Sequence, residues 1–127
     1  MAFAEPSDGA RNIKQSSPGR GQEVTLIGTV QIGDPIYGGS TGWARACAAD
    51  DTKRTMMIAS QSGVSGDKII AYPDVLLDFG SGCTATIGAD LFLSDTAGDY
   101  SASTGTWKQV IGRMLTGRVA HVWGVHS

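Results

Sequence analysis

Short segments of alternating apolar and polar residues, separated by glycine-rich turns, follow one another through most of the chain. In "DVLLDF" (74–79), Val75, Leu77 and Phe79 fall on one side of an extended chain, and two aspartates fall on the other. The 18 glycines exceed the usual share of about 7% and are spread along the sequence. This pattern predicts many short strands joined by tight turns.

Further segments have the β-branched and aromatic composition of strands, with turn-forming residues between them. They are EVTLIGTV (23–30), DPIYGGSTGW (34–43), TMMIAS (55–60), DKIIAY (67–72), ADLFLS (89–94), KQVIGRML (108–115) and RVAHVWGV (118–125). The run 43–59 lacks glycine and proline and is long enough for a helix, but its "AADDTK" is typical of a turn, so we expect two strands there. We predict an all-β fold, a small β-barrel or sandwich of about nine or ten short strands.

An internal repeat indicates that the fold consists of two related halves. "IGDPIYGGSTG" at 32–42 matches "IGADLFLSDTAG" at 87–98, with the apolar–aromatic pairs Ile36–Tyr37 and Leu91–Phe92 in corresponding places. Each copy is followed by a run with an apolar pair, in "TMMIAS" and in "KQVIGR". Two copies are too few for a solenoid, so a barrel or sandwich with two similar halves fits better.

Residues 1–22 differ in composition from the rest of the chain. They contain prolines, glycines and small polar residues without helical or strand periodicity. Such a segment buries too little apolar surface to offset the entropy that is lost when it becomes ordered. We therefore expect an extended N-terminal arm over 1–22 and one β domain over 23–127.

Composition argues against several classes of partner. Only 17% of the residues are charged, the net charge is −2, and no basic run is present, so nucleic acid is not expected as a partner. No apolar stretch reaches the roughly 20 residues that cross a bilayer. The first 15 residues lack the basic flank and apolar core of a secretory signal, so we expect synthesis and retention in a cytoplasm.

No catalytic or nucleotide-binding motif is complete. "GVSGD" has Asp67 where a nucleophile elbow needs its second glycine, and "GSGCTA" has Ala85 where a dinucleotide loop needs its third. The lysine of a phosphate-binding loop is absent as well. We therefore expect neither an enzyme nor a bound cofactor.

The potential metal ligands Cys47, Cys83, His121 and His126 lack the close pairing that zinc sites use. We interpret the two cysteines as small apolar residues, and the sequence does not decide whether they form a disulfide. His121, which lies on the last predicted strand, is expected to be a hydrogen-bonded structural residue. No metal is expected at these positions.

The acidic turn "SDTAGD" could suggest calcium, but it lacks the regular oxygen spacing and distal glutamate of a calcium loop. Asp95 at the start of the turn and Gly98 in a positive-φ position explain it as a structural turn. The aromatic residues Trp43, Trp107 and Trp123 could form a carbohydrate platform, or they could anchor a core or an interface.

The chain resembles the small β-barrel capsid decoration, or head cement, proteins of tailed bacteriophages over residues 23–123. The resemblance lies in "GDPIY", "DTKRTMMIASQSGVSGDKIIAY" and "TIGADLFLSDTAGDYSASTG…KQVIGRML". The matching positions are Gly33, Asp34, Tyr37, Gly66, Asp67, Gly88, Leu93, Ser94, Asp95, Thr96, Ala97 and Gly98. Of these, Gly33, Asp34, Gly66, Asp67, Gly88, Asp95 and Gly98 are expected to form structural turns. The first copy departs from the pattern by having Gly38–Gly39 where the second has "LSD".

The resemblance implies a structural virion protein on the outer surface of the capsid, made in the host cytoplasm. Such a protein binds the assembled head, bridges subunits of the major capsid protein and stabilises the shell. It also implies a homo-oligomer, with a trimer favoured and a dimer possible.

We expect the N-terminal arm to lie across the capsid surface. The residues expected to contact the capsid are Phe3, Pro6, Arg11, Ile13, Lys14 and Arg20. Phe3 and Ile13 would be apolar anchors, and the basic residues would pair with acidic groups on the shell. The alternative for the arm is order imposed by neighbouring copies of the chain.

The alternative function is a module of a phage tail or fibre that binds a host surface glycan. That function predicts a groove lined by tryptophans and by acidic or amide side chains.

Overall fold

The computed structural model describes residue 3 and residues 11–80 and 82–124. Eleven strands and one turn of 3-10 helix, η2 (Asp51–Lys53), make up its regular structure. The strands are β1 (Asn12–Ser16), β2 (Gln22–Thr25), β3 (Pro35–Gly38), β4 (Trp43–Arg45), β5 (Met57–Ala59), β6 (Lys68–Tyr72), β7 (Asp74–Asp78), β8 (Asp90–Leu93), β9 (Tyr100–Ser101), β10 (Val110–Met114) and β11 (Val119–Trp123). Within the described residues, no helix is long and apolar enough to cross a membrane.

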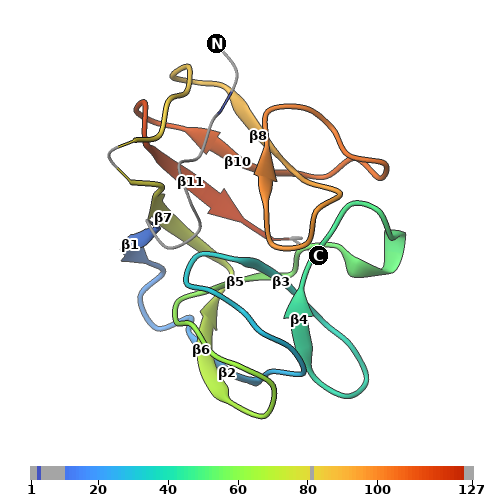
Figure 1. Ribbon diagram of the computed structural model, residues 1–127. Coiled ribbons are helices and arrows are strands. Elements are labelled where there is room, and N and C mark those ends of the chain that lie inside the picture. Colours follow the sequence, from blue (N-terminus) through green and yellow to red (C-terminus); the bar gives the residue numbers. More distant parts are fainter. Residues whose placement is uncertain (1–2, 4–10, 81, 125–127) are drawn as a thin grey trace.

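The strands form two antiparallel sheets that pack as a small β sandwich (Figure 1). The six-stranded sheet has the order β1-β7-β11-β10-β8-β9, and the five-stranded sheet has the order β2-β6-β5-β3-β4. The all-β prediction is confirmed, and the sandwich describes the fold better than the barrel, because the described strands form no closed barrel. Strand β5 of the smaller sheet packs against β7 and β11 of the larger one.

The two sheets share one topology, which confirms the prediction of two related halves. Starting from β4, the smaller sheet runs β4-β3-β5-β6-β2, and starting from β9, the larger runs β9-β8-β10-β11-β7. Taken in chain order, the strands β2 to β6 of the smaller sheet therefore correspond one by one to the strands β7 to β11 of the larger sheet. The repeated sequences supply β3 and β8, which begin after Gly33 and Gly88, and both glycines have φ of 85°. The larger sheet has β1 in addition, at the outer edge of β7.

Strand β1 corrects the predicted boundary at residue 22. Residues 12–16 do not belong to an arm outside the domain, because they pair with β7 along the edge of the six-stranded sheet. Ile13 lies opposite Leu77, and Gln15 lies opposite Leu76, with a register shift between them. Without β1, the edge of β7 that faces away from β11 would have backbone N–H and C=O groups without partners, and β1 supplies those partners.

The alternation of buried and exposed side chains along the central strands shows which residues form the core. Val75 and Leu77 of β7 and Ala120 and Val122 of β11 are buried, as the period-two pattern predicts. They belong to the larger of two buried clusters, whose other members are Ala46, Ala48, Ile58, Phe79, Cys83, Leu91, Leu93, Tyr100, Ile111 and Met114. The smaller cluster consists of Val24, Leu26, Val30, Ile36, Ala59, Ile69 and Ala71.

The five-stranded sheet curls so that its two edge strands approach each other. The Ile27 N–H, just beyond β2, donates to the carbonyl oxygen of Trp43 in β4 at 2.9 Å. The curled sheet surrounds the smaller cluster. The single residue Pro73 separates β6 from β7, so the chain crosses from one sheet to the other almost directly.

The segment 43–59 forms two strands around a turn, as predicted. Asp50 caps the intervening 3-10 turn, and its side chain accepts a hydrogen bond from the Thr52 N–H at 2.9 Å. This local bond favours a turn over a continuous helix.

Candidate functional site

Polar side chains converge at two places in the domain. The first is a buried charge cluster, the Arg11 cluster, which consists of Arg11, Asp34 and Arg45. The Nη1 of Arg11 donates to Asp34 Oδ1 at 2.5 Å, and the Nε of Arg45 donates to Asp34 Oδ2 at 2.5 Å. The side chains of Arg11 and Asp34 have no solvent exposure. Arg11 immediately precedes β1 of the larger sheet and Asp34 immediately precedes β3 of the smaller sheet, so this charge pair joins segments that lead into both sheets.

The Arg11 cluster links the turn that opens the first repeated sequence to the turn that ends the second. Asp34 follows Gly33, and the Nη2 of Arg11 also donates to the carbonyl oxygen of Gly98 at 3.1 Å, in the turn of the second repeat. The guanidinium lies over the rings of Phe79 and Tyr100, with its Cζ 5.9 Å and 5.1 Å from the ring centroids. These contacts combine charge, hydrogen bonding and cation–π attraction.

Burial raises the pKa of Asp34, and the Gln31 N–H and the guanidiniums of Arg11 and Arg45 oppose that rise. A buried charge is tolerated when it is paired and hydrogen-bonded, as Asp34 is. The Arg11 and Asp34 side chains are enclosed, and both guanidiniums pair with the Asp34 carboxylate, which indicates a structural role for the cluster.

This geometry corrects the expected role of part of the N-terminal segment. Arg11 cannot pair with an acidic group on a capsid, because its side chain is enclosed by the protein's own residues. Ile13 is half-buried and packs on the larger cluster. Phe3 packs edge-on against Phe79, with ring centroids 4.8 Å apart, so it is an anchor for this domain.

The other expected contact residues have different surroundings. Lys14 and Arg20 are exposed, and the Lys14 side chain keeps 53% of its surface accessible although its Nζ lies 4.0 Å from Asp78. Pro6 lies outside the described residues. Of the six residues expected to contact a capsid, the structure therefore presents Lys14 and Arg20 to solvent.

The expected turn residues lie where the chain reverses direction. Gly66 and Gly98 have φ of 93° and 82°, in the left-handed region that favours glycine. Asp67 accepts from the Val64 N–H at 2.9 Å, and Asp95 accepts from the Thr106 N–H at 2.8 Å. These carboxylates fix loop backbone by hydrogen bonds.

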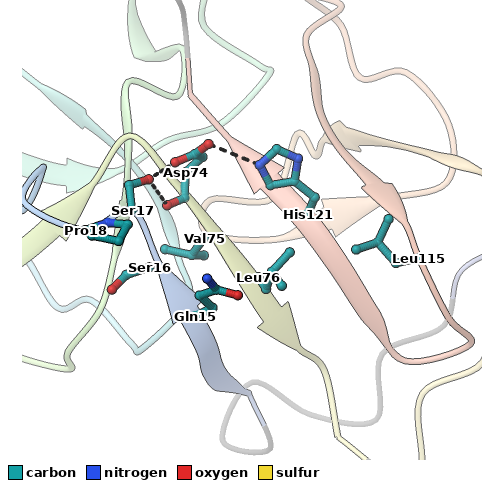
Figure 2. Close-up of a pocket in the computed structure, with 9 residues that line it drawn as sticks. All are labelled: Gln15, Ser16, Ser17, Pro18, Asp74, Val75, Leu76, Leu115 and His121. Carbon is teal, nitrogen blue, oxygen red and sulfur yellow. Dashed lines mark hydrogen bonds and ion pairs between the residues drawn. The ribbon is translucent and has the colours of Figure 1, made fainter.

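The second convergence is a surface pocket of about 360 Å³, the Asp74 pocket (Figure 2). It lies where the end of β1 meets β7 and β11. Its lining residues are Gln15, Ser16, Ser17, Pro18, Asp74, Val75, Leu76, Leu115 and His121. The pocket is open to solvent and combines polar side chains with an apolar floor.

Asp74 is the hydrogen-bonding centre of this pocket. The Ser17 hydroxyl bonds to the Asp74 carboxylate and also donates to the Asp74 carbonyl oxygen at 3.0 Å. The His121 Nε2 lies 3.1 Å from Asp74 Oδ2 (Figure 2). The prediction that His121 is a hydrogen-bonded residue of the last strand is confirmed.

These three residue types also occur in serine hydrolases, but the order of contacts differs. A catalytic triad needs the histidine between the serine and the aspartate, so that the imidazole can take the hydroxyl proton. Here Asp74 stands between Ser17 and His121. The arrangement therefore cannot activate Ser17 as a nucleophile by the triad mechanism.

A second carboxylate of β7, Asp78, forms a bidentate ion pair with Arg118. The distances are 2.9 Å from Nε to Oδ1 and 2.7 Å from Nη2 to Oδ2. The Arg118 hydrogen bonds, helped by the Gly80 N–H, lower the pKa of Asp78 to about 2, although burial acts in the opposite direction. This pair fastens β7 to the turn before β11.

Within the described part of the chain, no group of three or more histidine, cysteine, aspartate or glutamate residues is placed to hold a metal. Cys47 and Cys83 are not joined by a disulfide, which answers the question that the sequence left open.

The tryptophans lie on three different segments. Trp43 in β4 packs closely over Gly38, Trp107 is 47% exposed in the loop before β10, and Trp123 in β11 contacts the His121 ring with centroids 5.2 Å apart. Among the described ring contacts, none joins two tryptophans. The Asp74 pocket has acidic and amide groups but no tryptophan in its lining.

Comparisons with known protein families, with curated protein sequences and with solved structures find no match in any of the three.

Sequence reasoning missed the Asp74 pocket as a unit. Ser17, Asp74 and His121 are far apart in the chain and form no motif. The available signal was the alternation in β7 and β11, which assigns Asp74 and His121 to the outward faces of two strands without showing that the strands are neighbours.

Proposed function

We propose that this chain is a structural virion protein that decorates the outer surface of an assembled bacteriophage head. It binds the major capsid protein, bridges neighbouring subunits and stabilises the shell. The observation that carries the proposal is the resemblance of its turn sequences to those of head decoration proteins.

Those turn sequences have corresponding places in the two halves of the fold, which supports the proposal. Gly33 precedes β3 and Gly88 precedes β8, and each glycine has the same positive φ. The "SDTAG" turn connects β8 to β9, where "GGSTG" connects β3 to β4. The resemblance therefore concerns positions that determine the fold and not an arbitrary set of small residues.

A protein that binds only the assembled shell stabilises it by mass action, because disassembly must then include the loss of that binding. An oligomer multiplies individually weak contacts through their high effective concentration. A small β domain whose strands are joined by glycine turns suits this role, and the role needs no catalytic site. We expect the domain to act as a homo-oligomer, either a trimer or a dimer.

Within this proposal, the exposed basic residues Lys14 and Arg20 remain candidates for contact with acidic groups of the capsid. Phe3, Arg11 and Ile13 are withdrawn from that role because they pack within the domain. The capsid contact is therefore expected on the folded surface and not along a detached arm of 22 residues.

The test is to mix the purified protein with undecorated, expanded heads of the corresponding phage. We would measure co-sedimentation and then occupancy by electron microscopy. Saturable binding with a fixed number of copies per capsomer supports head decoration and identifies the symmetry position. A folded protein that does not bind heads overturns the proposal, and a glycan array would then test the tail or fibre alternative.

A further inference from the structure

The Asp74 pocket contains a carboxylate at one end of an apolar floor. Leu76 and Leu115 supply the apolar surface, and Leu115 is 47% exposed although it is a large hydrophobic residue. The Asp74 side chain is about one-third exposed, with 31% of its surface accessible. A ligand can therefore reach the carboxylate and cover the leucines at the same time.

The Asp74 carboxylate retains acceptor capacity. An ionised carboxylate offers about four acceptor positions. Ser17 and His121 use one position on each oxygen, since the hydroxyl bonds to Oδ1 and the imidazole nitrogen lies 3.1 Å from Oδ2. One free position on each oxygen leaves room for two parallel N–H donors.

Asp74 differs from the other carboxylates on the strands of its sheet in that its basic neighbour is a histidine, His121, at 3.1 Å. Asp78 pairs with Arg118, and Asp90 pairs with Arg113 at 3.3 Å. In the described part of the six-stranded sheet, Asp74 is the strand carboxylate without a lysine or arginine within salt-bridge distance. Its negative charge is therefore available to a positive group from outside the chain.

We propose that the Asp74 pocket binds an arginine side chain of a protein partner. The guanidinium makes two N–H hydrogen bonds to the Asp74 carboxylate, and the aliphatic stem lies across Leu76 and Leu115. The planar fork of a guanidinium matches the two oxygens of a carboxylate, whereas an ammonium group presents a single point charge. Long basic side chains commonly cover apolar surface with their stems while the charged head stays polar.

Other features of the chain agree with this occupant. The net charge of −2 favours the approach of a cationic segment. A second surface pocket, of about 500 Å³, is lined by residues 29–32 and 62–64 and has no ionisable side chain in its lining, so the charge argument is specific to the Asp74 pocket. A sugar ligand would be expected to use an aromatic platform, and the Asp74 pocket lining has none.

This inference does not depend on head decoration. If the chain decorates a capsid, the arginine belongs to the capsid partner. If it does not, the pocket still selects an arginine-bearing segment, and the peptide test below reports on the pocket alone.

The test uses the full-length protein labelled with ¹⁵N and two short peptides, Ac-Gly-Arg-Gly-NH₂ and Ac-Gly-citrulline-Gly-NH₂. Citrulline has nearly the same shape as arginine but no charge. We expect the arginine peptide to cause saturable shifts in the backbone amide signals of Ser17, Leu76, Leu115 and His121, with a dissociation constant in the millimolar range. The citrulline peptide should cause much smaller shifts at the same concentrations.

Two variants and a control separate the charge from the apolar floor. Asp74→Asn should weaken arginine-peptide binding by about two- to fivefold, as expected for loss of a partly exposed ion pair. Leu115→Ser, at an exposed position, should weaken binding without changing the charge. Asp90→Asn removes a carboxylate that is already paired on the same sheet and should leave binding unchanged.

The proposal is overturned if both peptides bind equally, if neither causes saturable shifts, or if Asp74→Asn binds as well as the unmodified protein. Shifts of the same four signals by methyl glycosides, without shifts by the arginine peptide, would also overturn it. If Asp74→Asn does not fold, as seen from loss of signal dispersion, the comparison of Leu115→Ser with the two peptides decides the question.

Discussion

The guanidinium of Arg11 and the carboxylate of Asp34 meet 2.5 Å apart although 23 positions separate them in the chain, and neither side chain is exposed. Asp34 belongs to the turn before β3 in the smaller sheet, and Arg11 immediately precedes β1 in the larger sheet. This contact therefore attaches the start of the chain to both halves of the sandwich.

Removing Arg11 should be strongly destabilising. Arg11→Met keeps an apolar stem but leaves Asp34 buried with one guanidinium fewer, and loss of one partner of a buried pair costs about 3 to 5 kcal/mol. The free energy of unfolding in urea measures the effect. The matched control is Lys14→Met, which removes an exposed basic residue three positions away and should change stability by less than about 0.5 kcal/mol. Equal effects of the two substitutions would contradict the structural role of the Arg11 cluster.

Gly33 and Gly88 provide a matched pair for measuring steric crowding. Both have φ of 85°, so alanine at either position incurs backbone strain of about 1 to 2 kcal/mol. A Cβ at Gly33 would also lie 2.7 Å from Leu77 Cδ1, whereas a Cβ at Gly88 would meet no atom within 4 Å. Gly33→Ala should therefore lower the melting temperature more than Gly88→Ala. The reverse order would show that the close approach of Gly33 to Leu77 is not maintained in solution.

Stability should depend on Asp78 at acidic pH. The folded pKa of Asp78 is about 2, below its ordinary value of 3.8, because Arg118 hydrogen-bonds to the ionised carboxylate. A lowered folded pKa contributes stability that is fully present above the unfolded pKa and is lost as the pH falls toward the folded one. We expect the melting temperature of the unmodified protein to fall between about pH 4 and pH 2.

Asp78→Asn is the comparison for that pH dependence. The variant should be less stable at neutral pH, because it lacks the ion pair with Arg118. It should also lose less stability than the unmodified protein between about pH 4 and pH 2. Parallel melting curves over that range would assign the acid sensitivity to other carboxylates.

Deletion of residues 2–20 should not leave a stable domain. The deletion removes β1 and Arg11, which uncovers the edge of β7 and takes away one partner of Asp34. An open edge strand promotes association between chains. Size-exclusion chromatography and thermal unfolding should show aggregation or loss of the cooperative transition. The double variant Lys14→Ala/Arg20→Ala, which changes exposed side chains of the same segment, should remain folded, and a stable monomer after the deletion would contradict the integration of β1.

Local sequence patterns predicted the strands well, because the formation of a strand depends largely on residues that are close together in the chain. In the second strand segment, Val24 and Leu26 are buried while Thr25 and Ile27 are exposed, as the alternation indicates. The repeated turns likewise predicted two related halves, since positive-φ glycine is a local requirement.

Contacts between distant segments could not be read in this way. Residues 12–16, "NIKQS", contain a single apolar residue, so their sequence alone does not indicate a strand. They form a strand because they pair with the open edge of β7, which lies about 60 positions further along the chain. Arginine is seldom fully buried, so composition alone places Arg11 at the surface. The Asp74 pocket arises only because β7 and β11 pair in a register that sets Leu76 opposite His121.

The position of β1 has a consequence for biosynthesis. Of the described strands, β1 is translated before the others, but its partner β7 is made only after the entire five-stranded sheet has been translated. The smaller half can therefore begin to fold before β1 has its partner, and the six-stranded sheet is completed only after β8, β10 and β11 have also been translated. The edge contact of β1 therefore depends on a strand that lies on the far side of the whole smaller sheet in the sequence.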